Sequence, residues 1–299
     1  MSTRKEESEK KASPYFDVKS LLNQVISNID ELFLNKKDVT GIPTGFIEID
    51  KMLAGLQPSN LIVIASRPAM GKTSFVLNIV ANATIGSQIN VGIFSLEMPR
   101  EQLVTRLISS EGKIDSQALR TGKLNNDEYS KISKVACVLS ETKIYIDDSS
   151  GISIELLCER SREMKTDKNI QLIVVDYFQL IDSKNELHDM DYISKKLKSL
   201  AKELKIPIIV LSQLSSESED RPNKTPFISD LPGSGSLADA ADVVLFVFRE
   251  EVYKENDPLL RGLAEIIIAK QRNGPIGRVP LTFQKEFTLF TNYEGPGYG

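Results

Sequence analysis

The sequence predicts an α/β domain with a mostly parallel β-sheet, and three patterns support this fold class. From about residue 46, short apolar runs alternate with amphipathic stretches of helical length. The apolar runs are continuous and rich in β-branched residues, which is typical of parallel strands covered on both faces. Near the C-terminus, strand-like runs follow one another without helices between them. This last pattern predicts antiparallel hairpins added to one side of the sheet.

Composition and charge exclude several other classes of protein. The chain has 299 residues, of which 41% are hydrophobic and 26% charged, so it is not disordered throughout and can build a core. With 37 Lys and Arg against 41 Asp and Glu, the net charge of −4 excludes a uniformly basic nucleic-acid-coating protein. Two cysteines and one histidine, His188, offer little for a disulfide framework, a zinc site or a Ser-His-Asp triad.

Targeting and membrane segments are not evident in the sequence. Residues 1–11 are charged and lack the apolar core of a signal peptide. The longest apolar runs, such as residues 61–65, are far shorter than a membrane span. We therefore expect a soluble, cytoplasmic protein that makes no membrane contact.

The chain is predicted to begin with a flexible charged tail at residues 1–14. An amphipathic helix within residues 15–38 follows, because apolar side chains recur at steps of three and four from Val18 to Phe33. A polar stretch with Gly and Pro then separates this helix from the main domain, residues 39–299. The apolar stripe suits either its own domain or a neighbouring subunit, and composition alone favours neither.

Within the main domain, the alternation of patterns predicts parallel strands joined by helices. The strands are expected at residues 60–66, 90–96, 143–147, 171–176, 206–212 and 242–248. The intervening helices are expected at residues 72–86, 99–112, 126–140, 153–167 and 190–205. The C-terminal strands are expected at residues 265–271, 279–283 and 287–291.

The first strand leads into a P-loop, the phosphate-binding turn between a strand and a helix. Gly71-Lys72-Thr73 opens the helix, where backbone N–H groups and the helix dipole favour a phosphate. Lys72 is placed to reach the β- and γ-phosphates of ATP, and Thr73 to bind Mg²⁺. Ser66 stands where glycine is usual, so its backbone must suit a residue with a Cβ. The predicted nucleotide-binding residues are Ser66, Arg67, Pro68, Ala69, Met70, Gly71, Lys72, Thr73 and Ser74.

Two further strand ends carry carboxylates. Asp176 ends an apolar strand in the layout of a Walker B segment, which places it beside the P-loop and within reach of Mg²⁺. Glu97 ends the first strand after the P-loop helix, where a carboxylate can orient the attacking water for hydrolysis. The alternative for Glu97 is a helix-start residue, because Pro99 is suited to open the next helix. The other NTPase motifs favour the catalytic role.

Together with further motifs in the same order, these residues resemble the RecA-like motor domain of bacterial replicative DNA helicases of the DnaB type. The resemblance extends from about residue 39 to residue 293. Besides the P-loop, it rests on Thr44-Gly45-Phe46 with Asp50, Leu53-Ala54-Gly55-Leu56, Phe94-Ser95-Leu96-Glu97-Met98, Asp176-Tyr177-Phe178-Gln179-Leu180-Ile181, Leu211-Ser212-Gln213-Leu214, Ser229-Asp230-Leu231, Gly235-Ser236, Ala241-Asp242-Val243 and Lys270-Gln271-Arg272-Asn273-Gly274.

The resemblance implies a ring motor. Six such domains would surround single-stranded DNA, bind ATP and Mg²⁺ between neighbours and move 5′ to 3′, with the helix at 15–38 packed on the next subunit. Gln213 would couple the γ-phosphate to DNA, and Lys270 and Arg272 would reach the γ-phosphate on the adjacent subunit. A guanidinium stabilises charge on the transferring phosphoryl group, so hydrolysis would require assembly. On the residues alone, Asn273-Gly274 also fits a solvated hairpin turn.

The expected DNA contacts depart from the family pattern at one place. Leu231 is followed by Pro232-Gly233, where the family usually has an Arg and an acidic residue. Glycines there still allow backbone N–H groups to approach phosphate. Exposed loops with scattered charge have the same composition, so that alternative stays open. The predicted DNA-binding residues are Arg221, Lys224, Gly233 and Gly235, within lining segments 183–189 and 215–235.

The resemblance also bears on partners and on competing functions. The family's N-terminal domain, which handles primase, is not matched here, so we expect either the motor half of a longer protein or a shorter natural relative. Primase and a helicase loader are the further partners that the resemblance implies. Other candidates are a recombinase or clock-type RecA-like ATPase, a nucleotide-binding interaction module with little turnover, and, less favoured, a small-molecule kinase. The Lys270-Gln271-Arg272 segment favours the helicase over other RecA-like ATPases. Retention of Lys72, Glu97 and Asp176 argues against a module without turnover.

Overall fold

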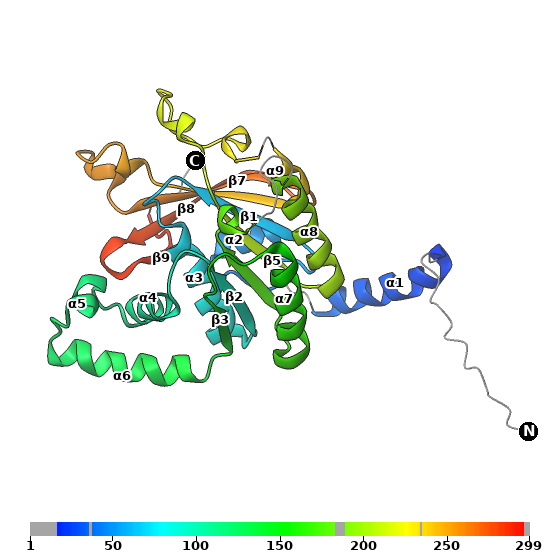
Figure 1. Cartoon of the computed structure of the whole chain (residues 1–299), viewed down its shortest axis with the longest axis horizontal. Coiled ribbons are helices and arrows are strands. Elements are labelled where there is room, and N and C mark those ends of the chain that lie inside the picture. Colours follow the sequence, from blue (N-terminus) through cyan, green and yellow to red (C-terminus); the bar gives the residue numbers. More distant parts are fainter. Residues whose placement is uncertain (1–16, 36–37, 183–188, 234, 296–299) are drawn as a thin grey trace, which may run out of the picture.

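A central sheet with helices on both faces forms the body of the molecule, and one N-terminal helix projects from it (Figure 1). The structure, a computed structural model, describes residues 17–35, 38–182, 189–233 and 235–295. The predicted tail at 1–14 and His188 lie outside the described residues. Over the described ranges, no helix is both long and apolar enough to cross a bilayer.

The sheet has nine strands in the part of the chain that is described, in the order β3-β2-β4-β5-β1-β6-β7-β8-β9. The parallel strands are β1 (Leu61–Ser66), β2 (Val91–Ser95), β3 (Ile144–Asp147), β4 (Leu172–Asp176), β5 (Ile208–Gln213) and β6 (Val243–Phe248). The antiparallel strands, which extend the sheet beyond β6, are β7 (Leu263–Gln271), β8 (Gly277–Gln284) and β9 (Leu289–Asn292). The predicted fold class and the C-terminal hairpins are confirmed, and each strand overlaps its predicted range.

Helices cover the sheet on both faces and create two apolar cores. They are α2 (Ile47–Leu53), α3 (Lys72–Ala81), α4 (Arg100–Gly112), α5 (Ser116–Thr121), α6 (Asn126–Ser140), α7 (Ile154–Lys168), α8 (Asp189–Leu204) and α9 (Ser236–Ala240). Side chains of α2, α3 and α4 enter one core, and those of α7, α8 and α9 the other. Because successive strand residues point to opposite faces, Ile62 and Ile64 of β1 lie in the first core and Leu61 and Val63 in the second.

The short helices α2, α5 and α9 have no counterpart among the predicted elements. Each is too short to show an apolar repeat at helical spacing. Local hydrogen bonds account for two of them. The Asp115 carboxylate accepts a bond from the Ala118 N–H at the start of α5. The Asp50 carboxylate accepts bonds from the Thr44 N–H and hydroxyl, which closes the turn before α2.

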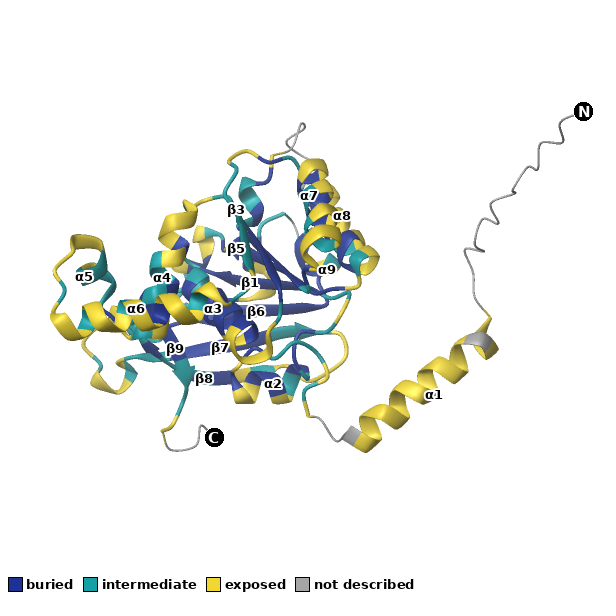
Figure 2. Cartoon of the chain, turned by 90° about the horizontal axis from the view of Figure 1, so that it is seen from below, coloured by how far each residue is buried: buried dark blue, intermediate teal, exposed yellow. Residues whose placement is uncertain are grey.

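Helix α1 (Val18–Asn35) stands apart from the body in both overall views (Figures 1 and 2). Its apolar stripe is exposed, with Val25 at 50%, Ile29 at 57% and Phe33 at 75% of full accessibility. The alternative in which this stripe packs on its own domain is therefore wrong. An exposed apolar row on a helix is typical of a surface that binds another chain.

An aromatic cluster holds the C-terminal strands against the P-loop helix. The ring of Phe75 in α3 stacks on Phe46, with centroids 5.1 Å apart, and forms a T-shaped pair with Phe290 in β9, with centroids 5.5 Å apart. The rings of Phe290 and Phe283 lie 4.5 Å apart. A Cβ added at Gly71, whose φ is +93°, would approach the Phe290 ring to 3.1 Å. The P-loop therefore rests directly on the C-terminal hairpin.

Truncation of the central ring tests this arrangement. Phe75→Ala is expected to lower the free energy of unfolding by about 3–5 kcal/mol, because the ring is fully buried between three elements. Chemical denaturation of the purified chain measures this loss. Tyr129→Ala, at a side chain that is 68% exposed, should change stability by less than about 0.5 kcal/mol. Equal losses in the two variants would contradict the assigned core.

Candidate active site

The P-loop begins at the carboxyl end of β1 and leads into α3. Ser66 is the last residue of β1 and lies opposite Gln213, the last residue of β5. Ser66 keeps strand geometry, so the expectation that its backbone suits a Cβ is confirmed. Backbone with positive φ falls instead on Ala69, at 64°, and on Gly71, at 93°. The turn therefore needs glycine immediately before α3, where a side chain would also crowd the C-terminal hairpin.

A cavity of about 450 Å³ opens above this loop, within the size range of small-molecule sites. All predicted nucleotide-binding residues from Ser66 to Ser74 line it, and so do Glu97 and Gln213. The structure thus brings together side chains from three strand ends. The sequence reasoning missed other lining residues, namely Met98, Gln102, Arg106, Arg249, Phe283, Lys285 and Thr288.

Thr73 and Asp176 form a pair that suits Mg²⁺. The Thr73 hydroxyl donates a hydrogen bond to Asp176 Oδ2 at 2.9 Å. Asp176 is buried, and its Oδ1 atom has no hydrogen-bond partner in the structure. Burial raises the pKa of this carboxyl group, and the nearby Lys72 charge opposes that shift. A hydroxyl and a buried carboxylate with a spare oxygen are donors that Mg²⁺ prefers, so these residues fit the ion.

Lys72 is a cation held in a partly desolvated position. Burial lowers the pKa of its ammonium group, while the carboxylates of Asp176 and Glu97 oppose that shift. The ammonium nitrogen lies 5.1 Å from the centre of the Tyr177 ring. The Lys72 ammonium group and the N-terminus of α3 both carry positive charge at this position, which favours binding of a polyanionic ligand.

Glu97 lies just beyond β2 at the tip next to Asp176. Ser95, the last residue of β2, pairs with Asp176, and the Leu96 N–H donates to the Asp176 carbonyl oxygen at 2.7 Å. Glu97 is exposed to the cavity and influences the titration of Lys72 and Asp176. The structure thus places the Glu97 carboxylate at the same cavity as the P-loop, and its catalytic role stays a prediction.

Arg106 of α4 is a further charge at this site. Burial lowers the pKa of its guanidinium group, and the carboxylates of Asp176 and Glu97 oppose that shift. Its neighbours Leu103 and Leu107 are buried in the core. A cation beside the apolar stripe of a helix is the sequence signal that could have identified it. Arg106 therefore adds a second cation, besides Lys72, close to the two carboxylates.

The Arg67 side chain is directed away from the phosphate turn. Its guanidinium donates to the Leu214 carbonyl oxygen at 2.7 Å and pairs with Glu219 at 2.9 Å. Only 14% of this side chain is exposed. Although Arg67 lines the cavity, its charge therefore holds the loop that follows β5.

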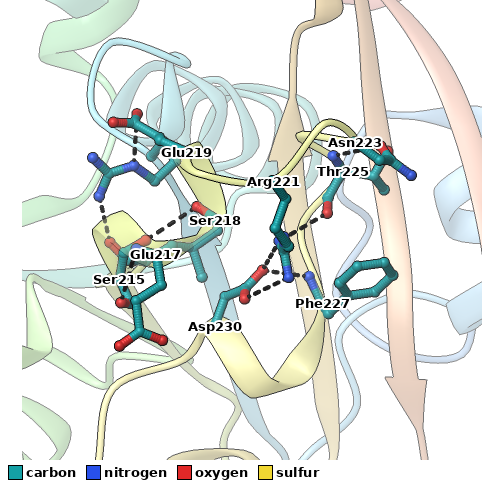
Figure 3. A network of polar contacts seen from close by, with 11 residues as sticks. Ser215, Glu217, Ser218, Glu219, Arg221, Asn223, Thr225, Phe227 and Asp230 are labelled. Atoms are coloured by element: carbon teal, nitrogen blue, oxygen red, sulfur yellow. Dashed lines mark hydrogen bonds and ion pairs between the residues drawn. The ribbon is translucent and has the colours of Figure 1, made fainter.

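That loop also contains two predicted DNA-binding cations, Arg221 and Lys224, and Figure 3 shows the contacts of Arg221. Arg221 pairs with both carboxylate oxygens of Asp230, at 3.0 and 2.7 Å, and its guanidinium lies 4.7 Å from the Phe227 ring centre. Lys224 donates to the Glu219 carbonyl oxygen. Both cations are therefore already engaged within the loop.

The remaining predicted DNA contacts lie further along the chain. Gly233 and Gly235 adopt positive φ values of 82° and 89°, and Gly235 immediately precedes α9. In the predicted lining segment 183–189, residues 183–188 lie outside the described residues.

Lys270 and Arg272 lie near the amino ends of the parallel strands, whereas the P-loop lies at their carboxyl ends. Residues 271 and 270 of β7 pair with the first residues of β6, and β6 runs parallel to β1. The length of β1, roughly 17 Å for six residues, therefore separates these cations from the phosphate turn. The Lys270 ammonium donates to the Ala238 carbonyl oxygen at 2.6 Å. Lys270 and Arg272 cannot reach a phosphate bound by their own chain.

The fold and the P-loop cavity at the carboxyl ends of the parallel strands define a P-loop nucleotide-binding domain of RecA-like architecture. Comparisons with known proteins narrow the class. Residues 41–292 match the DnaB-like helicase C terminal domain family, and the chain belongs to that family.

Named relatives agree with this assignment. The chain is 44% identical over 291 residues to replicative DNA helicase DnaC of Bacillus subtilis, and 45% identical over 296 residues to replicative DNA helicase DnaB of Buchnera aphidicola subsp. Schizaphis graminum. These matches cover 95% and 97% of the chain but 64% and 63% of the relatives, so the chain spans somewhat less than two thirds of their length.

Two solved structures, each with 33% sequence identity to the chain, have the same fold. The first, described as an ATPase domain, superposes with a TM-score of 0.87, over 93% of this chain and 100% of that one. The second, a DnaB-like replicative helicase described with its interactions with primase, superposes with a TM-score of 0.85, over 94% of this chain and 68% of that one.

The orientation of Arg67 makes a testable distinction between two P-loop cations. Arg67→Gln is expected to raise the Kd for ATP by less than about threefold, because the guanidinium is engaged by Glu219 and Leu214. Lys72→Ala should raise it by about tenfold or more, since it removes a charge-assisted bond to phosphate. Titration with a fluorescent ATP analogue measures both constants. Equal weakening would place the Arg67 guanidinium on the nucleotide.

Proposed function

We propose that the chain is the ATP-dependent motor of a replicative DNA helicase, which forms a hexameric ring around single-stranded DNA and moves 5′ to 3′. One observation carries the proposal. The P-loop lies at the carboxyl ends of the parallel strands, and Lys270 and Arg272 lie near their amino ends. A site that contains both the P-loop and these two cations therefore needs two chains. The membership of the DnaB-like family and the identity to replicative helicases support the same activity.

The residues of the cavity divide the work of hydrolysis between them. Lys72 and the backbone N–H groups of the P-loop hold the β- and γ-phosphates of ATP, and Glu97 orients the attacking water. Thr73 and Asp176 hold Mg²⁺, which supplies positive charge at the phosphate oxygens when bound. Lys270 and Arg272 of the neighbouring subunit stabilise charge on the transferring phosphoryl group.

Gln213 connects the nucleotide to the DNA side. It lines the cavity at the end of β5, and its backbone carbonyl accepts a hydrogen bond from the Gln179 amide at 2.8 Å. The next residue, Leu214, accepts a bond from Arg67 and leads into the loop with Arg221 and Lys224. A change in the γ-phosphate state at Gln213 therefore moves the base of a loop that faces DNA in this proposal. Gly233 and Gly235 offer backbone N–H groups to the DNA phosphates.

Assembly uses the exposed stripe of α1. A groove of about 310 Å³ between α4, α6 and β3 is lined mainly by apolar side chains, among them Val104, Ile108, Leu139, Ile144 and Ile146. The stripe of α1 and this groove on the next subunit are complementary, because each exposes apolar surface that its own chain leaves uncovered. Primase and a helicase loader complete the cytoplasmic assembly.

Strand polarity tests the function directly. The chain, assembled with ATP and Mg²⁺, is expected to unwind a forked duplex with a 5′ single-stranded tail and to leave a duplex with only a 3′ tail intact. Release of a labelled strand measures unwinding, and Lys72→Ala should abolish it. Turnover stimulated by DNA without release of either duplex would instead favour a recombinase-like ATPase. No turnover at all would favour a nucleotide-binding interaction module.

A further inference from the structure

Asp242 lies at the junction between the Arg272 side chain and the body of the domain. It is the residue immediately before β6 and is buried, with 9% of its side chain exposed. Its Oδ1 atom lies 3.3 Å from a guanidinium nitrogen of Arg272. The Arg272 N–H also donates to the Asp242 carbonyl oxygen at 3.0 Å. Both the backbone and the side chain of Arg272 are therefore held by this one residue.

The Asp242 carboxylate is itself held in place from its other side. Its Oδ2 atom accepts bonds from the Leu61 N–H at 2.8 Å and from the Lys198 ammonium at 2.5 Å. Leu61 begins β1, and Lys198 lies in the middle of α8. The carboxylate is thus fixed by a central strand and a packed helix, so it offers Arg272 a rigid anchor.

Backbone carbonyl groups of α9 complete the arrangement. Arg272 donates to the Asp239 carbonyl oxygen at 3.0 Å, and Lys270 donates to the Ala238 carbonyl oxygen at 2.6 Å. These carbonyl groups lie in the last turn of a helix, where their partial negative charge attracts cations. About half of the Arg272 side chain, 48%, remains exposed.

We propose that Asp242 is a positioning residue for Arg272, which it orients for action on the nucleotide of the neighbouring subunit. The inference rests on the proposed function, in which Arg272 works in trans. The arginine side chain has several rotatable bonds, so its guanidinium group samples many orientations. A fixed carboxylate in contact with the guanidinium restricts these orientations even before a neighbouring subunit binds. Loss of the carboxylate therefore weakens transition-state stabilisation on the next subunit and leaves nucleotide binding by its own P-loop intact.

Steady-state kinetics separate this role from a purely structural one. Asp242→Asn keeps the shape of the side chain and removes its charge. It is expected to lower kcat about tenfold or more while KM for ATP changes less than about twofold. Lys198→Met leaves the charge of the carboxylate and its bond from the Leu61 N–H in place, so it should lower the Tm but lower kcat clearly less than Asp242→Asn does. Lys195→Gln, one turn away on α8 at an exposed pair with Asp191, is the matched control.

The outcomes of this comparison are distinct. A kcat for Asp242→Asn within twofold of the unmodified chain would overturn the inference. Equal loss of kcat in Asp242→Asn and Lys198→Met, in step with their loss of Tm, would also overturn it, because Asp242 would then act only through stability.

Mixed rings distinguish failure of this inference from failure of the proposed function. Asp242→Asn subunits have an intact P-loop, and Lys72→Ala subunits have an intact Arg272. Turnover of their mixture is therefore expected to exceed that of either variant alone by severalfold. A parallel mixture pairs Arg272→Ala with Lys72→Ala. Recovery in the parallel mixture alone would overturn the role of Asp242 and leave the shared site standing. If turnover recovers in neither mixture, Arg272 does not act on the neighbouring subunit, and the inference about Asp242 is overturned as well.

Discussion

The distance along β1, from the amino to the carboxyl ends of the parallel strands, is the constraint on which the rest of the structure depends. Parallel strands place the P-loop and the ends of β2, β4 and β5 at one edge, while antiparallel pairing of β7 with β6 returns Lys270 and Arg272 to the other. Side chains cannot span the length of β1. A domain built in this way places its own Lys72 and Arg106 at the P-loop cavity but keeps Lys270 and Arg272 out of reach of it. In the proposed mechanism, hydrolysis therefore depends on the contact between neighbours.

Contacts near both ends of β1 hold the P-loop and Arg272 in place. The aromatic cluster ties the P-loop helix, which follows β1, to β9 at the end of the hairpins. Asp242 ties the other edge of the sheet to the first residue of β1 and to α8. These two sets of contacts therefore lie near opposite ends of β1, the strand that separates the P-loop from Lys270 and Arg272. In the proposed assembly, the exposed stripe of α1 is the apolar surface that binds a second copy.

Much of the fold and part of the site follow from the sequence, for physical reasons. The strands are predictable because a strand buried on both faces is mostly apolar, as β6 is throughout and β1 is up to Ser66. The phosphate turn is predictable because its Gly71 and Lys72 follow a strand directly. Side-chain direction is not predictable in the same way: Arg67 lies inside the motif yet turns to Glu219, and Arg221 turns to Asp230. Arg106 was missed because its partners come from distant strands that only the fold assembles.

The most direct measurement of the shared site is ATP turnover per subunit as a function of protein concentration, with and without a single-stranded oligonucleotide. A site completed by a neighbour predicts a rate per subunit that climbs with concentration as chains associate, and that rises again when DNA is present. A rate that stays constant down to concentrations where the chain is monomeric, and that ignores DNA, would mean that each chain carries a complete site. That result would contradict the division of the site between two chains.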